Sequence, residues 1–149
     1  MKKFITMVAM LLLFTVISRA QILTPVHWSY GAKKISKDEA VIFIKATIDD
    51  GWHVYSQYVK DGGPVKTTIT FPASVAYSLI GKTIEPTPIT RNEKVFSMDV
   101  SFFEHEVVFQ QKIKLKAGQA TVKGTLEYMT CNDHQCLPPD DIDFSVAVK

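Results

Sequence analysis

Residues 142–148 of this 149-residue chain spell Ile-Asp-Phe-Ser-Val-Ala-Val, and this alternation indicates most clearly how the chain folds. The apolar residues Ile142, Phe144, Val146 and Val148 stand at every second position. Successive side chains of a β-strand point to opposite faces of its sheet. The spacing therefore predicts a strand that turns one face toward a hydrophobic core.

Comparable segments follow one another from residue 26 onward. Further strands are predicted at 26–30, 41–48, 52–55, 66–71, 95–103, 107–115 and 121–129. The segment 41–48 is apolar at most of its positions, which predicts burial on most of both faces. Turn-forming residues separate the segments, as in Asp49-Asp50-Gly51 and Gly62-Gly63-Pro64. Short strands with this punctuation are typical of a β-sandwich, so the predicted fold class is all-β.

The N-terminus has the features of a secretory signal peptide. Two lysines at positions 2 and 3 precede an apolar run from Phe4 to Ile17, and Ser18-Arg19-Ala20 supplies small residues where signal peptidase cleaves. The apolar run is short for a membrane-spanning helix, which needs roughly 20 residues. We therefore predict a signal peptide over residues 1–20 and no membrane-spanning segment after its removal.

The remaining residues, 21–149, are long enough for one domain with its own core. Seventeen basic and fifteen acidic residues give a formal net charge of +2, and the basic residues are scattered. This distribution gives no indication of nucleic-acid binding. We expect a protein secreted across the inner membrane, periplasmic or extracytoplasmic, in a compartment where a disulfide persists.

The chain has two cysteines, Cys131 and Cys136, with four residues between them. A disulfide that closes so short a loop stabilises by about 2 kcal/mol, which a domain of this size does not need. A loop between the last two strands would give a redox couple an accessible thiolate and a nearby partner. Protonated His134 would lower the pKa of a neighbouring thiol, and Asp133 would raise it. A structural staple and a redox couple both remain open.

A metal site is the third possible interpretation of this loop. Cys131, His134 and Cys136 are suitable ligands, but they are only three and lie in one loop. The other histidines are scattered over strand or turn segments: His27, His53 and His105. A haem-attachment motif is absent from the sequence. We therefore predict no metal and no cofactor, and keep a small metal chaperone as the weakest alternative.

Two segments resemble a known family. The run from Gly124 to Pro139, Gly-Thr-Leu-Glu-Tyr-Met-Thr-Cys-Asn-Asp-His-Gln-Cys-Leu-Pro-Pro, is similar to the active-site segment of the N-terminal periplasmic domain of the thiol:disulfide interchange protein DsbD. The run from Asp50 to Tyr55, Asp-Gly-Trp-His-Val-Tyr, resembles the aromatic strand that this family places beside its cysteines. The resemblance extends over residues 21–149 in strand order.

The resemblance implies an immunoglobulin-like β-sandwich and a thiol–disulfide oxidoreductase. Its cysteines would relay electrons from a thioredoxin-like domain or membrane electron-transfer protein to envelope thiol proteins. Cys136 would form the mixed disulfide, and Cys131 would resolve it. The wall beside the sulfurs would consist of Tyr55, Trp52 and His134, although Trp52 is equally explained as a core residue.

The family also has a cap loop over its cysteines, and strand order places it at Glu85–Lys94, with Glu85 and Ile89 as candidates. Two features depart from the family pattern. The expected loop contains no aromatic residue, and four residues separate the cysteines where the best-known members have five. Those members also carry membrane and thioredoxin-like domains, so a free-standing module is expected here. The alternative function is an envelope binding or adaptor module with a structural disulfide.

Overall fold

A computed structural model describes residues 23–149, so the predicted signal peptide lies outside the described residues. These residues form strands joined by turns and loops, with no helix long and apolar enough to cross a membrane. The strands are β1 (Val26–Lys34), β2 (Glu39–Ile48), β3 (Trp52–Tyr55), β4 (Thr68–Thr70), β5 (Tyr77–Ile84), β6 (Ile89–Glu93), β7 (Met98–Phe103), β8 (Glu106–Leu115), β9 (Ala120–Tyr128), β10 (Thr130–Asn132) and β11 (Asp140–Val148).

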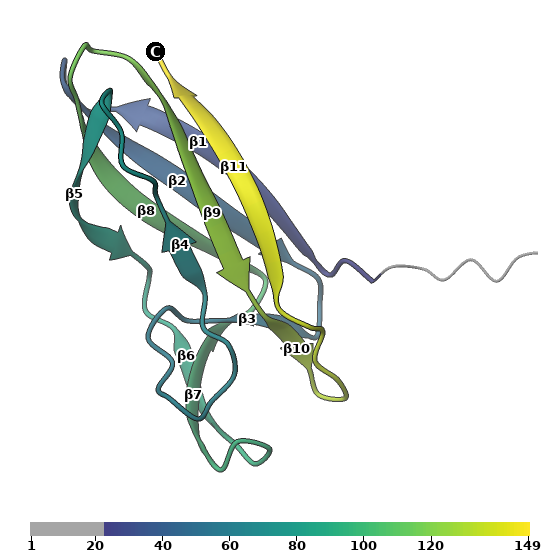
Figure 1. Ribbon diagram of the computed structural model, residues 1–149. Coiled ribbons are helices and arrows are strands. Elements are labelled where there is room, and N and C mark those ends of the chain that lie inside the picture. The colour runs from purple at the N-terminus through teal and green to yellow at the C-terminus, as the bar shows by residue number, and fades with distance from the viewer. Residues whose placement is uncertain (1–22) are drawn as a thin grey trace, which may run out of the picture.

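Two sheets form the body of the molecule (Figure 1). The first has the strand order β1-β2-β8-β5, and the second has the order β11-β9-β4. All neighbouring strands run antiparallel. The edges meet on one side, where β1 contacts β11. The predicted all-β, immunoglobulin-like sandwich is confirmed.

The main core lies between these two sheets. On β2 every second residue is buried, and the side chains between them are only half-buried apart from exposed Thr47. The prediction that 41–48 is buried on most of both faces is therefore wrong, because the second face of β2 is only partly covered. The facing strands contribute Phe109 and Ile113 from β8 and Val122 and Leu126 from β9, each completely buried.

A third sheet, with the order β10-β3-β7-β6, lies at one end of the sandwich. The chain enters it through the predicted turn at Asp49–Gly51, where Gly51 has a φ of 80° that favours glycine. The Trp52 N–H donates to the Asp49 carbonyl oxygen over 3.1 Å, which closes the turn directly before β3. This sheet has a small core of its own, and the core contains one of the two cysteines.

The predicted loop at Glu85–Lys94 is wrong over half of its length. Residues Ile89–Glu93 form β6, which pairs with β7 to make a hairpin whose turn spans residues 94–97. The segment lacks hydrophobic alternation because β6 is an edge strand with nearly every residue exposed. Residues 95–97 therefore belong to this turn and not to the strand predicted at 95–103.

Candidate functional site

Cys131 and Cys136 are joined in a disulfide, with their Cα atoms 4.0 Å apart. Their surroundings differ. Cys131 lies on β10 with 2% of its surface exposed, whereas Cys136 lies in the loop beyond β10 and is exposed. The pair was predicted to lie on an accessible loop between the last two strands. This description holds for Cys136 only, because Cys131 belongs to a short strand.

The six-residue ring is held by a compact turn. The Asn132 side-chain oxygen accepts hydrogen bonds from the backbone N–H groups of His134, over 2.9 Å, and Gln135, over 2.8 Å. The Asn132 N–H donates to the Gln135 carbonyl oxygen over 2.9 Å. An asparagine in this role folds the chain back on itself. The turn therefore presents Cys136 at the surface while Cys131 remains in the sheet.

Strand β3 lies directly beside the disulfide and has two different faces. Trp52 and Val54 pack in the main core, whereas Tyr55 packs with Cys131 in the small core. The antiparallel pairing of β10 with β3 sets Cys131 opposite His53. Side chains directly opposite each other project from the same face. His53 and Tyr55 therefore form the β3 side of the site, and Trp52 does not.

His53 is the residue that sequence reasoning missed. Its side chain is 7% exposed, and its Nε2 atom lies 3.1 Å from the Tyr55 hydroxyl. The imidazole also packs against the Phe102 ring, with 4.8 Å between ring centroids. Burial lowers the pKa of His53, because a buried imidazole loses the hydration of its charged form. Its place two residues before Tyr55 in a strand was the available signal.

Tyr55 was predicted as part of the wall, and it is 1% exposed beside Cys131 in the small core. Burial raises the pKa of Tyr55 to about 12, with a smaller contribution from the negative charge of Glu93. The phenol therefore stays protonated at neutral pH and keeps its hydroxyl available for His53. This is the predicted wall residue that the structure brings to the disulfide.

Most of the rest of the small core comes from the β6–β7 hairpin, and Val59 and Met129 complete it from outside the hairpin. Val100 and Phe102 on β7 are buried, and Phe96 and Met98 are partly buried against the same cluster. Phe96 lies in the hairpin turn, two residues beyond the segment in which the cap was expected. An aromatic side chain therefore does pack against this core, although the expected loop contains none.

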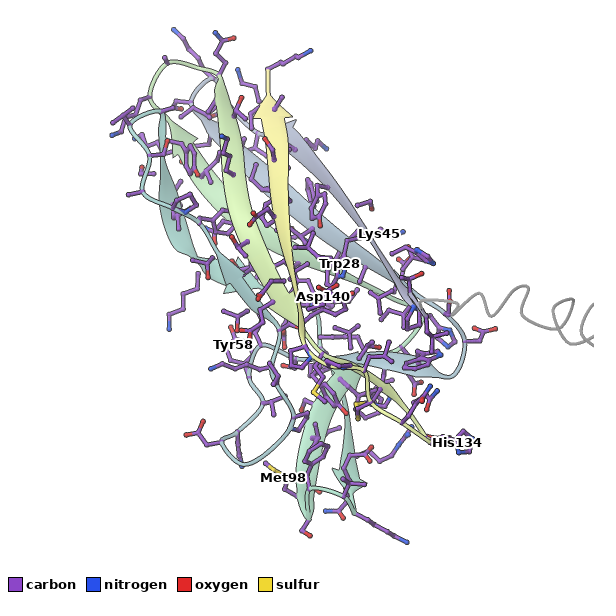
Figure 2. All side chains as sticks on the ribbon, turned by 45° about the vertical axis from the view of Figure 1, so that its right-hand side comes forward. Trp28, Lys45, Tyr58, Met98, His134 and Asp140 are labelled. Atoms are coloured by element: carbon purple, nitrogen blue, oxygen red, sulfur yellow. A yellow bond between two sulfur atoms is a disulfide. The ribbon has the colours of Figure 1, made fainter. Side chains whose placement is uncertain are left out.

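Of the three other predicted residues, His134 and Glu85 lie away from the small core, whereas Ile89 pairs with Phe102 of that core. Figure 2 shows His134 at the tip of the loop after β10, turned away from the sandwich. The Glu85 carboxylate accepts hydrogen bonds from the Ser56 hydroxyl and from the Gln57 backbone N–H, the latter over 2.9 Å. Glu85 thereby ties the end of β5 to the segment after β3. Ile89 is opposite Phe102 on β7, with 44% of its surface exposed.

Charged side chains surround the site on its hairpin side. The Arg91 guanidinium lies 5.0 Å from the Phe102 ring centroid and 3.6 Å from a Glu104 carboxylate oxygen. Glu93 and Asp133 are close enough to act on the charge of His53. Across residues 23–149 no three or more His, Cys, Asp or Glu side chains gather in a group that could hold a metal ion.

This geometry gives the two sulfurs different chemistry. Nucleophilic attack on a disulfide requires access to the attacked atom, and Cys136 is the exposed residue of the pair. Attack there expels Cys131, the buried sulfur, as the leaving thiolate. The disulfide thus joins one exposed and one buried cysteine, and the His53 imidazole and the Tyr55 phenol lie beside it.

Comparison with known proteins agrees with this geometry. The family model of the N-terminal domain of the thiol:disulfide interchange protein DsbD matches residues 20–147. No curated protein matches the chain.

Several solved structures share the fold. The reduced DsbD N-terminal domain of Neisseria meningitidis is 20% identical, with a TM-score of 0.55 over 81% of this chain and 85% of that one. The complex of the DsbD and PilB N-terminal domains of N. meningitidis gives 17% identity and the same TM-score, over 84% and 87%. The N-terminal periplasmic domain of ScsB from Proteus mirabilis gives 20% identity and a TM-score of 0.55, over 80% of this chain and 44% of that one.

Proposed function

The chain belongs to the family of the N-terminal domain of the thiol:disulfide interchange protein DsbD, and we propose that its disulfide relays electrons between envelope proteins. The electrons come from a thioredoxin-like domain or a membrane electron-transfer protein and pass to envelope thiol proteins. The observation that carries this proposal is the contrast between exposed Cys136 and buried Cys131. A purely structural disulfide does not need one reachable sulfur.

The relay has a reductive half. A thiolate of the reduced donor attacks Cys136 Sγ, the disulfide breaks, and Cys131 leaves as a thiolate with the bonding electron pair. The donor's second thiol then attacks the donor sulfur of the mixed disulfide and releases Cys136 as a thiolate. The donor is oxidised to a disulfide, and the Cys131–Cys136 pair is reduced by two electrons.

In the oxidative half, the reduced Cys131–Cys136 pair is the electron donor and an envelope protein with a disulfide is the acceptor. The Cys136 thiolate attacks an acceptor disulfide and forms a mixed disulfide, with one acceptor thiolate released. Cys131 then attacks Cys136 Sγ, re-forms the intramolecular disulfide and releases the second acceptor thiolate. Cys136 is therefore assigned as the nucleophile and Cys131 as the resolving thiol. Their separation of 4.0 Å between Cα atoms supports rapid resolution.

Two relatives support the partner class and the compartment. The DsbD N-terminal domain of N. meningitidis forms a complex with the PilB N-terminal domain, and the ScsB domain is periplasmic. We infer that this chain likewise engages a separate protein domain and works in the periplasm. The predicted signal peptide is consistent with this compartment.

Trapping experiments test the assigned roles. Reduced Cys131→Ser should form a stable mixed disulfide through Cys136 with a thioredoxin-like protein whose resolving cysteine is replaced by serine and whose remaining cysteine is activated as a thionitrobenzoate disulfide, because neither protein then has a second thiol to resolve it. Cys136→Ser should capture none, since its remaining thiol is buried. Non-reducing gels and mass spectrometry identify the linked cysteine. Capture by Cys136→Ser but not by Cys131→Ser would reverse the assigned roles.

The adaptor alternative makes a different prediction for the double variant. If the disulfide is only structural, Cys131→Ser/Cys136→Ser keeps its partner in a pull-down, and neither single variant forms a mixed disulfide. If the relay operates, the single variants differ in capture and a thioredoxin-like donor reduces the disulfide of the folded protein. A native protein that this donor cannot reduce would end the proposal.

A further inference from the structure

A buried histidine stands next to the buried sulfur. In the pairing of β10 with β3, Cys131 lies directly opposite His53. Residues in this relation have their Cβ atoms about 4.5–5.5 Å apart on one face of the sheet. The two side chains are 2% and 7% exposed, so little water separates or screens them. The buried hydroxyl of Thr130 donates to the His53 carbonyl oxygen over 2.8 Å, which fastens the two strands at this point.

The imidazole is held in one orientation. Its Nε2 atom is 3.1 Å from the Tyr55 hydroxyl, and its ring packs against Phe102 and edge-on against Tyr55, with centroid separations of 4.8 and 5.1 Å. The Tyr55 phenol stays protonated at neutral pH, so this contact is a hydrogen bond between neutral groups. In the tautomer whose Nε2–H donates to the Tyr55 hydroxyl oxygen, Nδ1 is the unprotonated nitrogen and binds the added proton.

Opening the disulfide creates a charge that this site must accommodate. The departing Cys131 sulfur becomes a thiolate at a position that water hardly reaches, and an uncompensated buried anion is costly. The charged groups that act on His53 are Arg91 and Glu93 from β6, Glu104 after β7, and Asp133 in the cysteine loop.

Only His53 can supply a new positive charge there. Arg91 is already paired with Glu104, and the remaining carboxylates, Glu93 and Asp133, repel a thiolate. The same carboxylates favour a protonated imidazole. Opposing them, burial keeps the ring neutral while the disulfide is intact. A Cys131 thiolate on the neighbouring strand offsets part of the cost of burying the charged ring, because it pairs with the imidazolium.

We propose that His53 is the positioning residue for Cys131, taking up one proton as the Cys131 thiolate leaves and releasing it when the disulfide re-forms. This inference rests on the proposed electron relay. In the forward step the electron pair of the broken S–S bond goes to Cys131, and a proton from solvent binds the His53 imidazole. In the reverse step the thiolate electrons form the new S–S bond, and the imidazolium returns its proton to solvent.

The test uses Cys136→Ser, in which Cys131 is the one remaining thiol, and follows its thiolate absorbance against pH. In this background His53→Gln should raise the pKa of Cys131 by about one unit, because a nearby imidazolium lowers a thiol pKa. His27→Gln is the matched control, since His27 is an exposed histidine on β1 and should leave the Cys131 pKa unchanged. An equal Cys131 pKa in the His53→Gln and parent proteins overturns the proposal.

A second measurement needs no substitution. Histidine NMR signals of the unaltered protein are titrated in its oxidised and reduced forms. The pKa of His53 should be higher in the reduced form than in the oxidised form, because the Cys131 thiolate favours the protonated imidazole. An unchanged pKa of His53 overturns the proposal. Neither titration uses a partner protein, so failure here is distinct from failure of the trapping experiment.

Discussion

At the scale of single residues, the two cysteines show how position alone separates identical side chains. Cys131 is buried because β10 pairs with β3 and places its side chain in the small core. Cys136 is exposed because the Asn132 turn carries the chain back outside the sheet. Cys136 is thus the exposed cysteine, and Cys131, beside His53, is the one that we propose as the leaving group.

His53 also links the site to the pH dependence of stability. Its pKa is lowered in the folded, oxidised protein, so the unfolded chain binds this proton first as the pH falls. The stabilisation from the neutral imidazole is complete above the unfolded value of about 6.5 and declines as pH falls toward the folded pKa. We expect His53→Gln to lose less free energy of unfolding than the parent between about pH 7.5 and about pH 5.5.

Urea unfolding of the oxidised proteins at the two pH values measures this difference. If the parent and His53→Gln lose equal amounts of free energy, His53 does not titrate differently in the folded and unfolded states.

The site residues were only partly predictable from sequence. The cysteines and Tyr55 were identified from a motif and an aromatic strand, and the structure brings them together. His53 was set aside as a scattered histidine, and Trp52 was offered for the wall although it packs in the main core. His53 belongs to the site and Trp52 does not, because the face of β3 that carries His53 is the one turned toward the sulfurs. That choice depends on pairing with β10, which lies far away in the sequence.

At the scale of elements, strands with one buried face were predictable and exposed edge strands were not. The alternation in β11 and β8 predicts them because every second residue is buried. β6 has almost no buried residue, and the three-residue β10 is too short to show a period. Both strands belong to the end sheet that contains the site.

Strand β9 contains a glycine whose missing side chain makes room for an aromatic ring. A Cβ atom added at Gly124 would lie 2.8 Å from Phe144 Cε1 and 2.9 Å from the Thr70 carbonyl oxygen. Gly124→Ala should therefore lower the free energy of unfolding by about 1–3 kcal/mol, the usual cost of overpacking. Urea unfolding at constant pH measures it.

Gly31 on β1 is the matched control. A Cβ added there meets nothing within 4 Å, and no left-handed φ opposes it. Gly31→Ala should be neutral or slightly stabilising, by up to about 1 kcal/mol, because alanine loses less conformational freedom in a strand. Equal destabilisation by the two substitutions would contradict the packing of Phe144 over Gly124.

At the scale of the whole molecule, the disulfide is separate from the core that holds the sandwich together. The main core joins the sheets β1-β2-β8-β5 and β11-β9-β4, and neither cysteine belongs to it. Cys131 belongs to the small core of the end sheet. The bond can therefore open and close while the main sandwich stays folded.

Reduction should thus leave a folded protein. A ring of six residues contributes about 2 kcal/mol through loop closure. For a domain of this size, that loss lowers Tm by roughly 5–10 °C. Near-UV circular dichroism and thermal unfolding of the oxidised and reduced forms test this expectation. Loss of the near-UV signal on reduction at room temperature would show that the disulfide holds the whole fold.

The sequence by itself determined the fold class, most of the long strands and the cysteine pair, because alternation and motif spacing are local properties of the chain. Only the tertiary structure decided which sulfur is exposed, that His53 stands beside Cys131, that Trp52 faces the main core, and that β6 is a strand. The physical reason is that strand register and burial depend on pairing between distant segments. A one-residue change in the register of β10 against β3 would turn Cys131 to the opposite face.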